Sequence, residues 1–178
     1  MPPPSKAWYE EVADGTLEQG DILADCPAGF LPLNWDPLSV EQDIQVDSFD
    51  LVVLTQSCDL AYDKVKYVVC CPIYAHLVMD GRPPLNNMNS EGRRKFKDMV
   101  IDGLMPGYCM IEEHVGELQR PISIVDFHEV FSMPKQFLQS VAENRHLRLV
   151  SPYREHISQS FARFFMRVGL PSNVRKFR

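Results

Sequence analysis

The sequence predicts an α+β fold: a small, strongly bent sheet or barrel with a helical insert and an amphipathic helix added at its C-terminal end. Short apolar, β-branched segments recur at irregular spacing, which is typical of a compact sheet of short strands. One segment near the C-terminus instead places apolar residues at helical spacing. With 178 residues and 45% apolar content, the chain can bury one core. We therefore expect one domain over residues 17–171, between an arm (1–16) and a basic tail (172–178).

The first third of the chain is predicted to hold two strands separated by a long loop. The proline-led arm favours a short helix around Lys6–Ala13. A turn at the glycine of Leu17–Ala24 is expected to lead into a short strand. Three prolines and little periodicity in Asp25–Gln45 predict an ordered loop. The continuous apolar run Phe49–Thr55 predicts a buried strand.

The middle of the chain is predicted to form a second buried strand and a helix. The strand covers Lys66–Ile73, and its Pro72 implies that the strand ends there or lies at a sheet edge. A turn-rich insert follows over Asp80–Asn89. Ser90–Leu104 has one apolar stripe, which predicts a helix capped by Ser90.

The last part of the chain is predicted to contain two short strands and two helices. The strands are expected over Tyr108–Glu112 and Ile122–Val130, and a turn followed by a short helix over Phe131–Leu147. The clearest helix covers Tyr153–Val168. Its apolar face consists of Ile157, Phe161, Phe164, Phe165 and Val168.

Charge is distributed unevenly along the chain. Residues 1–63 carry one lysine and 13 acidic residues, whereas residues 145–178 carry eight basic residues and one acidic residue. The basic segment could lie on the acidic half, in the same chain or in a second copy, or it could contact nucleic acid. The pI of about 5.3 argues against a general nucleic-acid coat.

The cysteines and the apolar runs favour a reducing, cytoplasmic location. Five cysteines cannot all be paired, and two of them, Cys70 and Cys71, are adjacent inside an apolar run. No run is long enough to cross a bilayer, and the first residues lack the features of a secretory signal. We therefore expect reduced thiols and no membrane contact.

Four short segments together resemble the MazF/PemK family of small toxins. They are Gly20-Asp21-Ile22-Leu23, Leu51-Val52-Val53-Leu54-Thr55, Val68-Val69-Cys70-Cys71-Pro72-Ile73 and Ile124-Val125-Asp126. The resemblance covers roughly residues 17–130. It implies an SH3-like barrel, a homodimer, and a place in a bacterial toxin–antitoxin or defence system, where active members cut single-stranded RNA.

The same resemblance implies catalytic residues that this chain lacks. The family has an arginine before its second strand, which serves phosphoryl transfer, and a threonine or serine after the Cys-Pro step; here these positions hold Asp50 and Ile73. Metal-free RNA cleavage needs a base near the 2′-hydroxyl and a cation near the phosphate. We therefore expect a diverged member that binds RNA or a partner protein without cutting. A different topology, or an arginine reaching this corner from elsewhere in the chain, would overturn that interpretation.

Four interpretations are open for the polar run Gln56–Asp59, which follows the strand predicted over Phe49–Thr55, and one of them is a loop that contacts a ligand. The run could be a tight turn with Cys58 packed inward. It could provide the catalytic thiol of a hydrolase, if a histidine folds close to Cys58. An active endoribonuclease would use a substituted site drawn from Ser57, Cys58, Asp59, Lys64 and Tyr74.

Basic residues near the C-terminus are the candidates for binding a partner. A partner protein, either antitoxin-like or a defence-system component, or a single-stranded RNA would contact Lys64, Arg154, Arg163, Arg167, Arg175 and Lys176. The neighbouring phenylalanines would pack in the core or a dimer interface, or would stack on RNA bases.

Neither a metal ion nor a cofactor is predicted. The chain has no Cys-x-x-Cys pair, so a zinc site would require distant cysteines to converge. The segments Glu112–His114 and Asp126–Glu129 are dense in metal-type ligands. We expect solvated edges with carboxylate–imidazole pairs there, although Asp126 also fits the MazF/PemK pattern.

Overall fold

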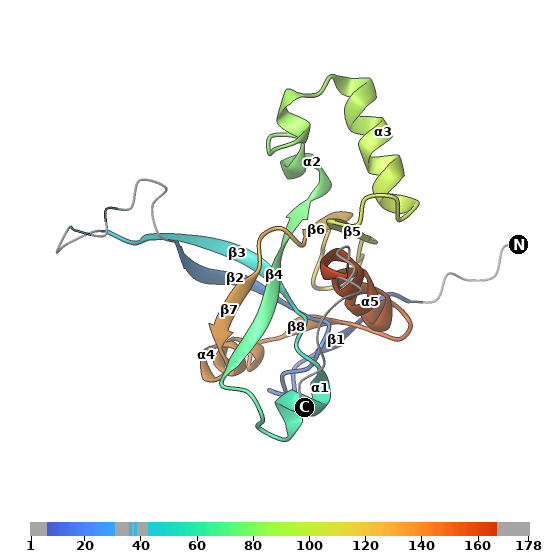
Figure 1. Ribbon diagram of the computed structural model, residues 1–178. Coiled ribbons are helices and arrows are strands. Elements are labelled where there is room, and N and C mark those ends of the chain that lie inside the picture. The colour runs from blue at the N-terminus through green and yellow to red at the C-terminus, as the bar shows by residue number, and fades with distance from the viewer. Residues whose placement is uncertain (1–6, 31–35, 37, 39–42, 167–178) are drawn as a thin grey trace, which may run out of the picture.

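An eight-stranded antiparallel sheet forms the centre of the protein (Figure 1). The structure is a computed structural model that describes residues 7–30, 36, 38 and 43–166. The strand order is β1-β8-β2-β3-β4-β6-β5, and β7 also pairs with β4. The α+β class is thus confirmed. The expected closed barrel is not, because the terminal strands β1 and β5 do not pair with each other in the described part of the chain.

The elements have the following bounds. The strands are β1 (Tyr9–Val12), β2 (Asp21–Phe30), β3 (Gln45–Val53), β4 (Tyr67–Ala75), β5 (Tyr108–Ile111), β6 (Ser123–Asp126), β7 (Phe131–Pro134) and β8 (His146–Leu149). The helices are α1 (Ser57–Ala61), α2 (His76–Met79), the 3-10 helix η1 (Leu85–Asn87), α3 (Ser90–Ile101), α4 (Lys135–Ala142) and α5 (Tyr153–Phe165).

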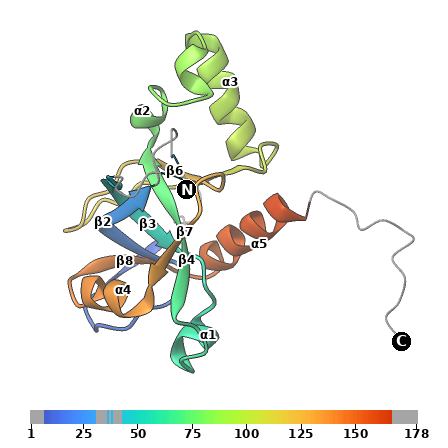
Figure 2. The same cartoon turned by 60° about the vertical axis from the view of Figure 1, so that its left-hand side comes forward.

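Both faces of the central strands are buried, which explains their continuous apolar sequence. Successive residues of β3 alternate between two core clusters: Leu51 faces the cluster covered by α4, and Val52 faces the cluster covered by α5. Leu138 of α4 and Ile157 of α5 are each almost fully buried in their own cluster. The two helices therefore lie on opposite faces of the sheet (Figure 2).

Strand β4 continues through its proline, contrary to the prediction that it ends there or lies at an edge. On the side away from β3, residues 67–70 of β4 pair with β7 and residues 73–75 pair with β6. Pro72 lies between these two stretches, opposite Leu51 of β3. A proline is tolerated at such a junction because the strand changes partner there and makes fewer ladder hydrogen bonds.

Several expected loops and turns are strands. Residues 9–12 form β1 instead of a helix, because they pair with β8. The loop predicted over Asp25–Gln45 is shortened, since β2 runs on to Phe30 and pairs with the first residues of β3. The turn predicted at Met133-Pro134 lies within β7. Each of these strands is stabilised by a distant partner that local periodicity does not reveal.

The three longest helices, α3, α4 and α5, lie close to their predicted places, whereas α1, α2 and η1 were not predicted as helices. Helix α3 is capped by Asn89 rather than Ser90: the Asn89 side chain accepts a hydrogen bond from the amide of Gly92 at 2.8 Å. Helix α5 begins at Tyr153 as predicted. The last two residues of the predicted helix, 167 and 168, lie outside the described residues.

A buried ionic network joins β2 to β8. Asp21 is fully buried and accepts hydrogen bonds from Arg148, at 2.5 Å from Nε and 3.0 Å from Nη2. Oδ2 of Asp21, the oxygen that accepts from Nη2 of Arg148, also lies 3.4 Å from Nε2 of His146. The turn before β2 is made by Gly20 (φ +89°), where a Cβ would meet the side chains of Leu149 and Arg154. The start of β2 is therefore fixed against β8 by charge and by close packing.

We predict that Arg148→Met lowers the free energy of unfolding by about 3 kcal/mol, since it leaves a buried carboxylate without its main partner. The side chain of Arg148 is only 6% exposed, so solvent does not screen the pair. Urea denaturation measures the loss. Arg94→Met, at an exposed position on α3, is the matched control and should change stability by less than about 0.5 kcal/mol. Equal stabilities of the two variants would contradict the network's role.

The second prediction concerns pH. Burial opposes protonation of His146, but its contact with the Asp21 carboxylate and the carbonyl of Asn144 raises its pKa above the usual value. A raised pKa means that the protonated imidazole stabilises the fold fully below about pH 6.5, and that this contribution is lost as the pH rises through the folded-state pKa. His146→Gln should therefore flatten the fall in unfolding free energy between about pH 6 and pH 8.5. Urea denaturation of the wild type and of His146→Gln at several pH values in that range tests this prediction. Unfolding free energies that change with pH in parallel in the two proteins would contradict it.

Candidate functional site

The corner singled out by the family resemblance is occupied by an ion pair. Asp50 and Ile73 are directly opposite each other in the β3–β4 register. Arg120, from the loop before β6, places its Nη2 2.7 Å from Oδ2 of Asp50. The expectation that this corner lacks a cation is therefore wrong. An arginine does reach it from elsewhere in the chain.

The environment of Arg120 nevertheless makes it unsuited to bind a phosphate. Its side chain is only 11% exposed, and the carboxylate of Asp50 neutralises it. Asp50 also accepts a hydrogen bond from the amide of Asp25 at 3.2 Å, at the irregular register of β2. Ile73, opposite Asp50 on the neighbouring strand β4, offers no group that transfers a proton. The corner consequently links β3, the β2 irregularity and the loop before β6, and it presents no free positive charge.

The polar run Gln56–Asp59 opens helix α1, at the end of β3. The hydroxyl of Ser57 accepts a hydrogen bond from the amide of Gln19 at 3.1 Å. The expectation that Cys58 packs inward is wrong: Cys58 is exposed, whereas the other four cysteines are buried. Its sulfur lies 3.6 Å from Oε1 of Gln56 and 3.7 Å from Oδ1 of Asp59. These oxygen neighbours are unlike the cationic surroundings that activate a thiol.

The substituted nuclease site proposed from the sequence is not assembled. Asp59 and Lys64 form an ion pair at 3.2 Å beside α1. Tyr74, however, lies at the other end of β4. Thr55, two residues before Ser57, accepts a hydrogen bond from the amide of Val69 in β4. Tyr74 lies five residues further along β4, so roughly 17 Å of strand separate it from the Ser57 end.

Tyr74 instead belongs to a polar cluster at the far end of β4. Its hydroxyl donates to Glu129, which also binds Arg82 at 2.5 Å. The guanidinium of Arg82 lies 4.0 Å from the centre of the Tyr74 ring. Burial, followed by the hydrogen bond to Glu129, raises the pKa of Tyr74 well above its usual value. Tyr74 is therefore a hydrogen-bond donor here and not a base.

A carboxylate–imidazole pair adjoins this cluster. Asp126 Oδ1 lies 2.7 Å from Nδ1 of His128 and also accepts from the backbone amide of His128. The His128 ring contacts Tyr108 and Phe164, and its side chain is 49% exposed. The predicted carboxylate–imidazole pairing is thus found. A second such pair joins His114 to Glu11 at 3.1 Å, and no group of metal-ligating side chains is placed to hold an ion among the described residues.

Most of the described C-terminal arginines are paired within the chain. Arg148 binds Asp21, Arg154 lies 3.5 Å from Glu18, and Arg145 lies 2.7 Å from Glu11. The uneven charge thus reflects, over the described residues, contacts between the basic C-terminal part and the acidic N-terminal part. Three predicted binding residues, Arg167, Arg175 and Lys176, lie outside the described residues.

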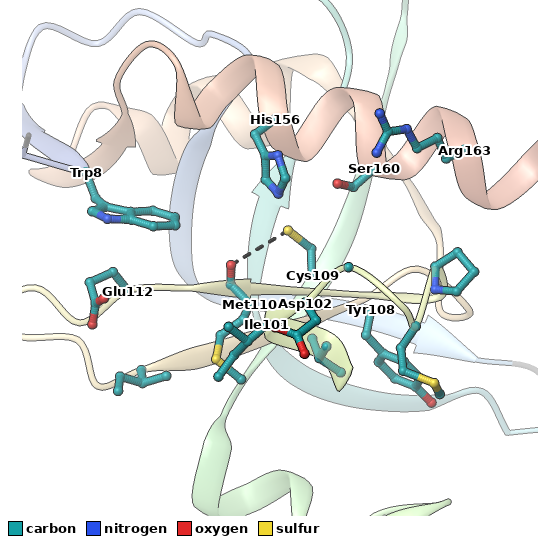
Figure 3. Close-up of a pocket in the computed structure, with 15 residues that line it drawn as sticks. Trp8, Ile101, Asp102, Tyr108, Cys109, Met110, Glu112, His156, Ser160 and Arg163 are labelled. Carbon is teal, nitrogen blue, oxygen red and sulfur yellow. Dashed lines mark hydrogen bonds between the residues drawn. The ribbon is translucent and has the colours of Figure 1, made fainter. Parts of the chain in front are cut away.

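The remaining described candidate, Arg163, lines a groove between α5 and the β5 edge of the sheet (Figure 3). The cavity measures about 540 Å³. Its α5 wall carries His156, Ser160 and Arg163, at helical spacing on one face. The facing wall and floor come from the end of α3, the loop after it, and β5. Their residues are Val100, Ile101, Asp102, Gly103, Met105, Pro106, Tyr108, Cys109, Met110 and Glu112, with Ile122 and Trp8 completing the lining.

The sequence contained a partial signal for this groove. The spacing of His156, Ser160 and Arg163 could have indicated a second face on the predicted helix, beside its phenylalanines. Trp8 gave no such signal, because it joins the groove only through the pairing of β1 with β8. Its indole stacks on the ring of Tyr153 with the ring centres 3.8 Å apart, which fixes that end of the groove.

Comparison with known proteins places this chain in no established family. No protein-family model matches it, and the search of curated proteins found no similar sequence. Among the described residues, no helix combines the length and the apolar character that crossing a membrane requires.

The exposure of the cysteines gives a third prediction. We expect iodoacetamide at pH 7.5 to modify one thiol per native chain, at Cys58, at the rate of an exposed thiol that is not activated and well before any buried thiol. Burial raises the pKa of Cys26 to about 11 and of Cys71 to about 12, so these thiols should react only after unfolding. Cys109 lines the groove, but burial also raises its pKa to about 11, so it should react much more slowly than Cys58. Intact-mass and peptide mass spectrometry identify the site. Modification that persists in Cys58→Ser would contradict the prediction.

Proposed function

We propose that this chain is a non-cleaving binding module that holds a partner protein in the groove between α5 and β5. In this proposal it is a diverged relative of MazF/PemK toxins, with an SH3-like core opened at one side. It would act beside an antitoxin-like protein or another defence component. The groove carries the proposal: it is a predominantly apolar cavity of about 540 Å³ on which a few polar side chains converge.

The chemistry of the family corner supports a protein that does not cut RNA. Asp50 and Ile73, the two positions that the resemblance equates with catalytic residues, are opposite each other in the β3–β4 register. There, the carboxylate engages the nearby guanidinium of Arg120. A buried, neutralised arginine stabilises a phosphate in flight poorly, and an isoleucine supplies neither acid nor base.

The charges around the groove favour a protein partner over RNA. Arg145, Arg148 and Arg154 are engaged by acidic side chains of the same chain. The groove itself is lined by Asp102 and Glu112 as well as Arg163. The groove thus has two carboxylates and one guanidinium. Binding of RNA depends on basic side chains that contact its phosphates, so this excess of negative charge disfavours RNA.

A second candidate function, RNA cleavage at a different site, is favoured by one observation. Asp126 engages Nδ1 of His128, so Nε2 of this half-exposed imidazole could act as a base near the Arg82 cluster. Incubation with mixed-sequence single-stranded RNA, with and without EDTA, separates the two functions. Cuts that disappear in His128→Gln would replace the binding proposal with this one.

The binding proposal predicts peptide ligands that depend on the groove. Random 12-residue peptides displayed on phage should yield clones that bind the wild type and fail on Ser160→Trp, whose indole fills the cavity. The loss should exceed about tenfold in affinity, because the bound apolar side chain loses its burial. Arg94→Glu, on the exposed face of α3, is the control and should bind normally. Fluorescence anisotropy measures each clone. Saturable binding of labelled single-stranded RNA, with no groove-dependent peptide, would overturn the proposal.

A further inference from the structure

The groove carries opposite charges at its two ends. Figure 3 shows Trp8 and Glu112 at one end and Arg163 with Tyr108 at the other. Glu112 and Arg163 are both exposed, and neither forms an ion pair within the described residues. Oε1 of Glu112 accepts a hydrogen bond from the amide of Glu113 at 3.1 Å, which leaves its other oxygen available to an incoming ligand, as is the guanidinium of Arg163.

The negative end combines two features that attract a cation. Glu112 supplies a carboxylate, and Trp8 supplies the aromatic ring with the most favourable surface for a positive charge. The hydroxyl of Tyr9, next to Trp8, donates to the backbone carbonyl of Glu112 and holds the two residues at the same end. Stacking on Tyr153 fixes the indole from the other side. An arginine or lysine side chain fits this end.

The centre of the groove suits an apolar side chain. Met110 lies between the two ends in Figure 3, Met105 and Val100 also line the groove, and methionine adapts its shape to different apolar ligands. Asp102 and Ser160 come from opposite walls and offer hydrogen-bonding groups to a backbone lying between them. An apolar residue in an extended segment would meet both kinds of contact.

The length of the groove sets the spacing of these contacts. Tyr108 and Glu112, which lie at the two ends of the groove, are four residues apart on the extended chain of β5 and the residue that follows it, which corresponds to roughly 13 Å. An extended chain advances about 3.3 Å per residue, so about four residues span this distance. A basic residue and an acidic residue separated by two apolar residues would reach both ends at once.

We propose that the occupant is a short extended segment of the partner protein with a basic side chain, two apolar side chains and an acidic side chain in succession. The basic side chain lies between Trp8 and Glu112. The acidic side chain forms a bidentate pair with Arg163. This inference rests on the proposed function, and it adds the chemistry by which the partner is recognised.

Three capped octapeptides of one scaffold test the inference. Each has a central leucine pair, flanked by arginine and aspartate, by two arginines, or by two aspartates. Fluorescence anisotropy in 50 mM salt measures their affinities. We expect the arginine–aspartate peptide to bind the wild type about tenfold more tightly than either other peptide.

Charge reversal at each end gives the sharper result. Arg163→Glu should shift the preference to the two-arginine peptide, and Glu112→Arg should shift it to the two-aspartate peptide. Both positions are exposed, so the variants should fold, which circular dichroism checks. Arg94→Glu makes the same charge change outside the groove and should keep the wild-type preference.

The outcomes separate this inference from the function on which it rests. Equal binding of all three peptides, abolished by Ser160→Trp, would overturn the charge pattern and leave groove binding intact. A preference that does not follow the two reversals would also overturn it. If no octapeptide binds while phage-selected peptides do, the proposed spacing is wrong. If neither set binds in a groove-dependent way, the proposed function fails as well.

Discussion

Strand β8 and its buried ion pair with β2 fix the geometry on which the groove depends. Arg148 of β8 neutralises Asp21, which has no access to water. The same strand pairs with β1, and the amide of Val150 donates to the carbonyl of Trp8 at 2.9 Å. Helix α5 starts only four residues after β8 ends. The Trp8 end and the α5 wall are therefore both positioned from one strand.

The uneven charge of the sequence is explained largely by this arrangement. Glu18, beside the turn before β2, lies within 3.5 Å of both Arg148 and Arg154. Arg145 similarly binds Glu11 of β1, which also contacts His114. Long-range pairing of this kind brings the two ends of the chain together without requiring a nucleic acid. Arg163 differs from these arginines, because it lines the groove, whereas Arg145, Arg148 and Arg154 bind acidic side chains.

Local sequence patterns predicted the elements that are defined by their own composition. The strands around Leu51 and Cys71 and the helices containing Phe96 and Ile157 follow from continuous or periodic apolar residues. Strands β1, β7 and β8 could not be predicted in this way. Each has four residues, and each is stabilised by a partner far along the chain. The spacing of His156, Ser160 and Arg163 could have indicated one wall of the groove, but the groove as a whole could not be predicted, because its walls come from four separate segments.

The acidic residue at the family corner is part of the fold, and not simply the loss of a catalytic group. Asp50 accepts hydrogen bonds both from Arg120 and from the amide of Asp25, where the β2–β3 register shifts. An arginine at position 50 would place two guanidinium groups against each other and leave that amide without its acceptor. Placing an arginine at position 50 therefore conflicts with the pairing that holds this corner. The corner at Asp50 is therefore a structural junction, and the groove between α5 and β5 lies at another edge of the sheet.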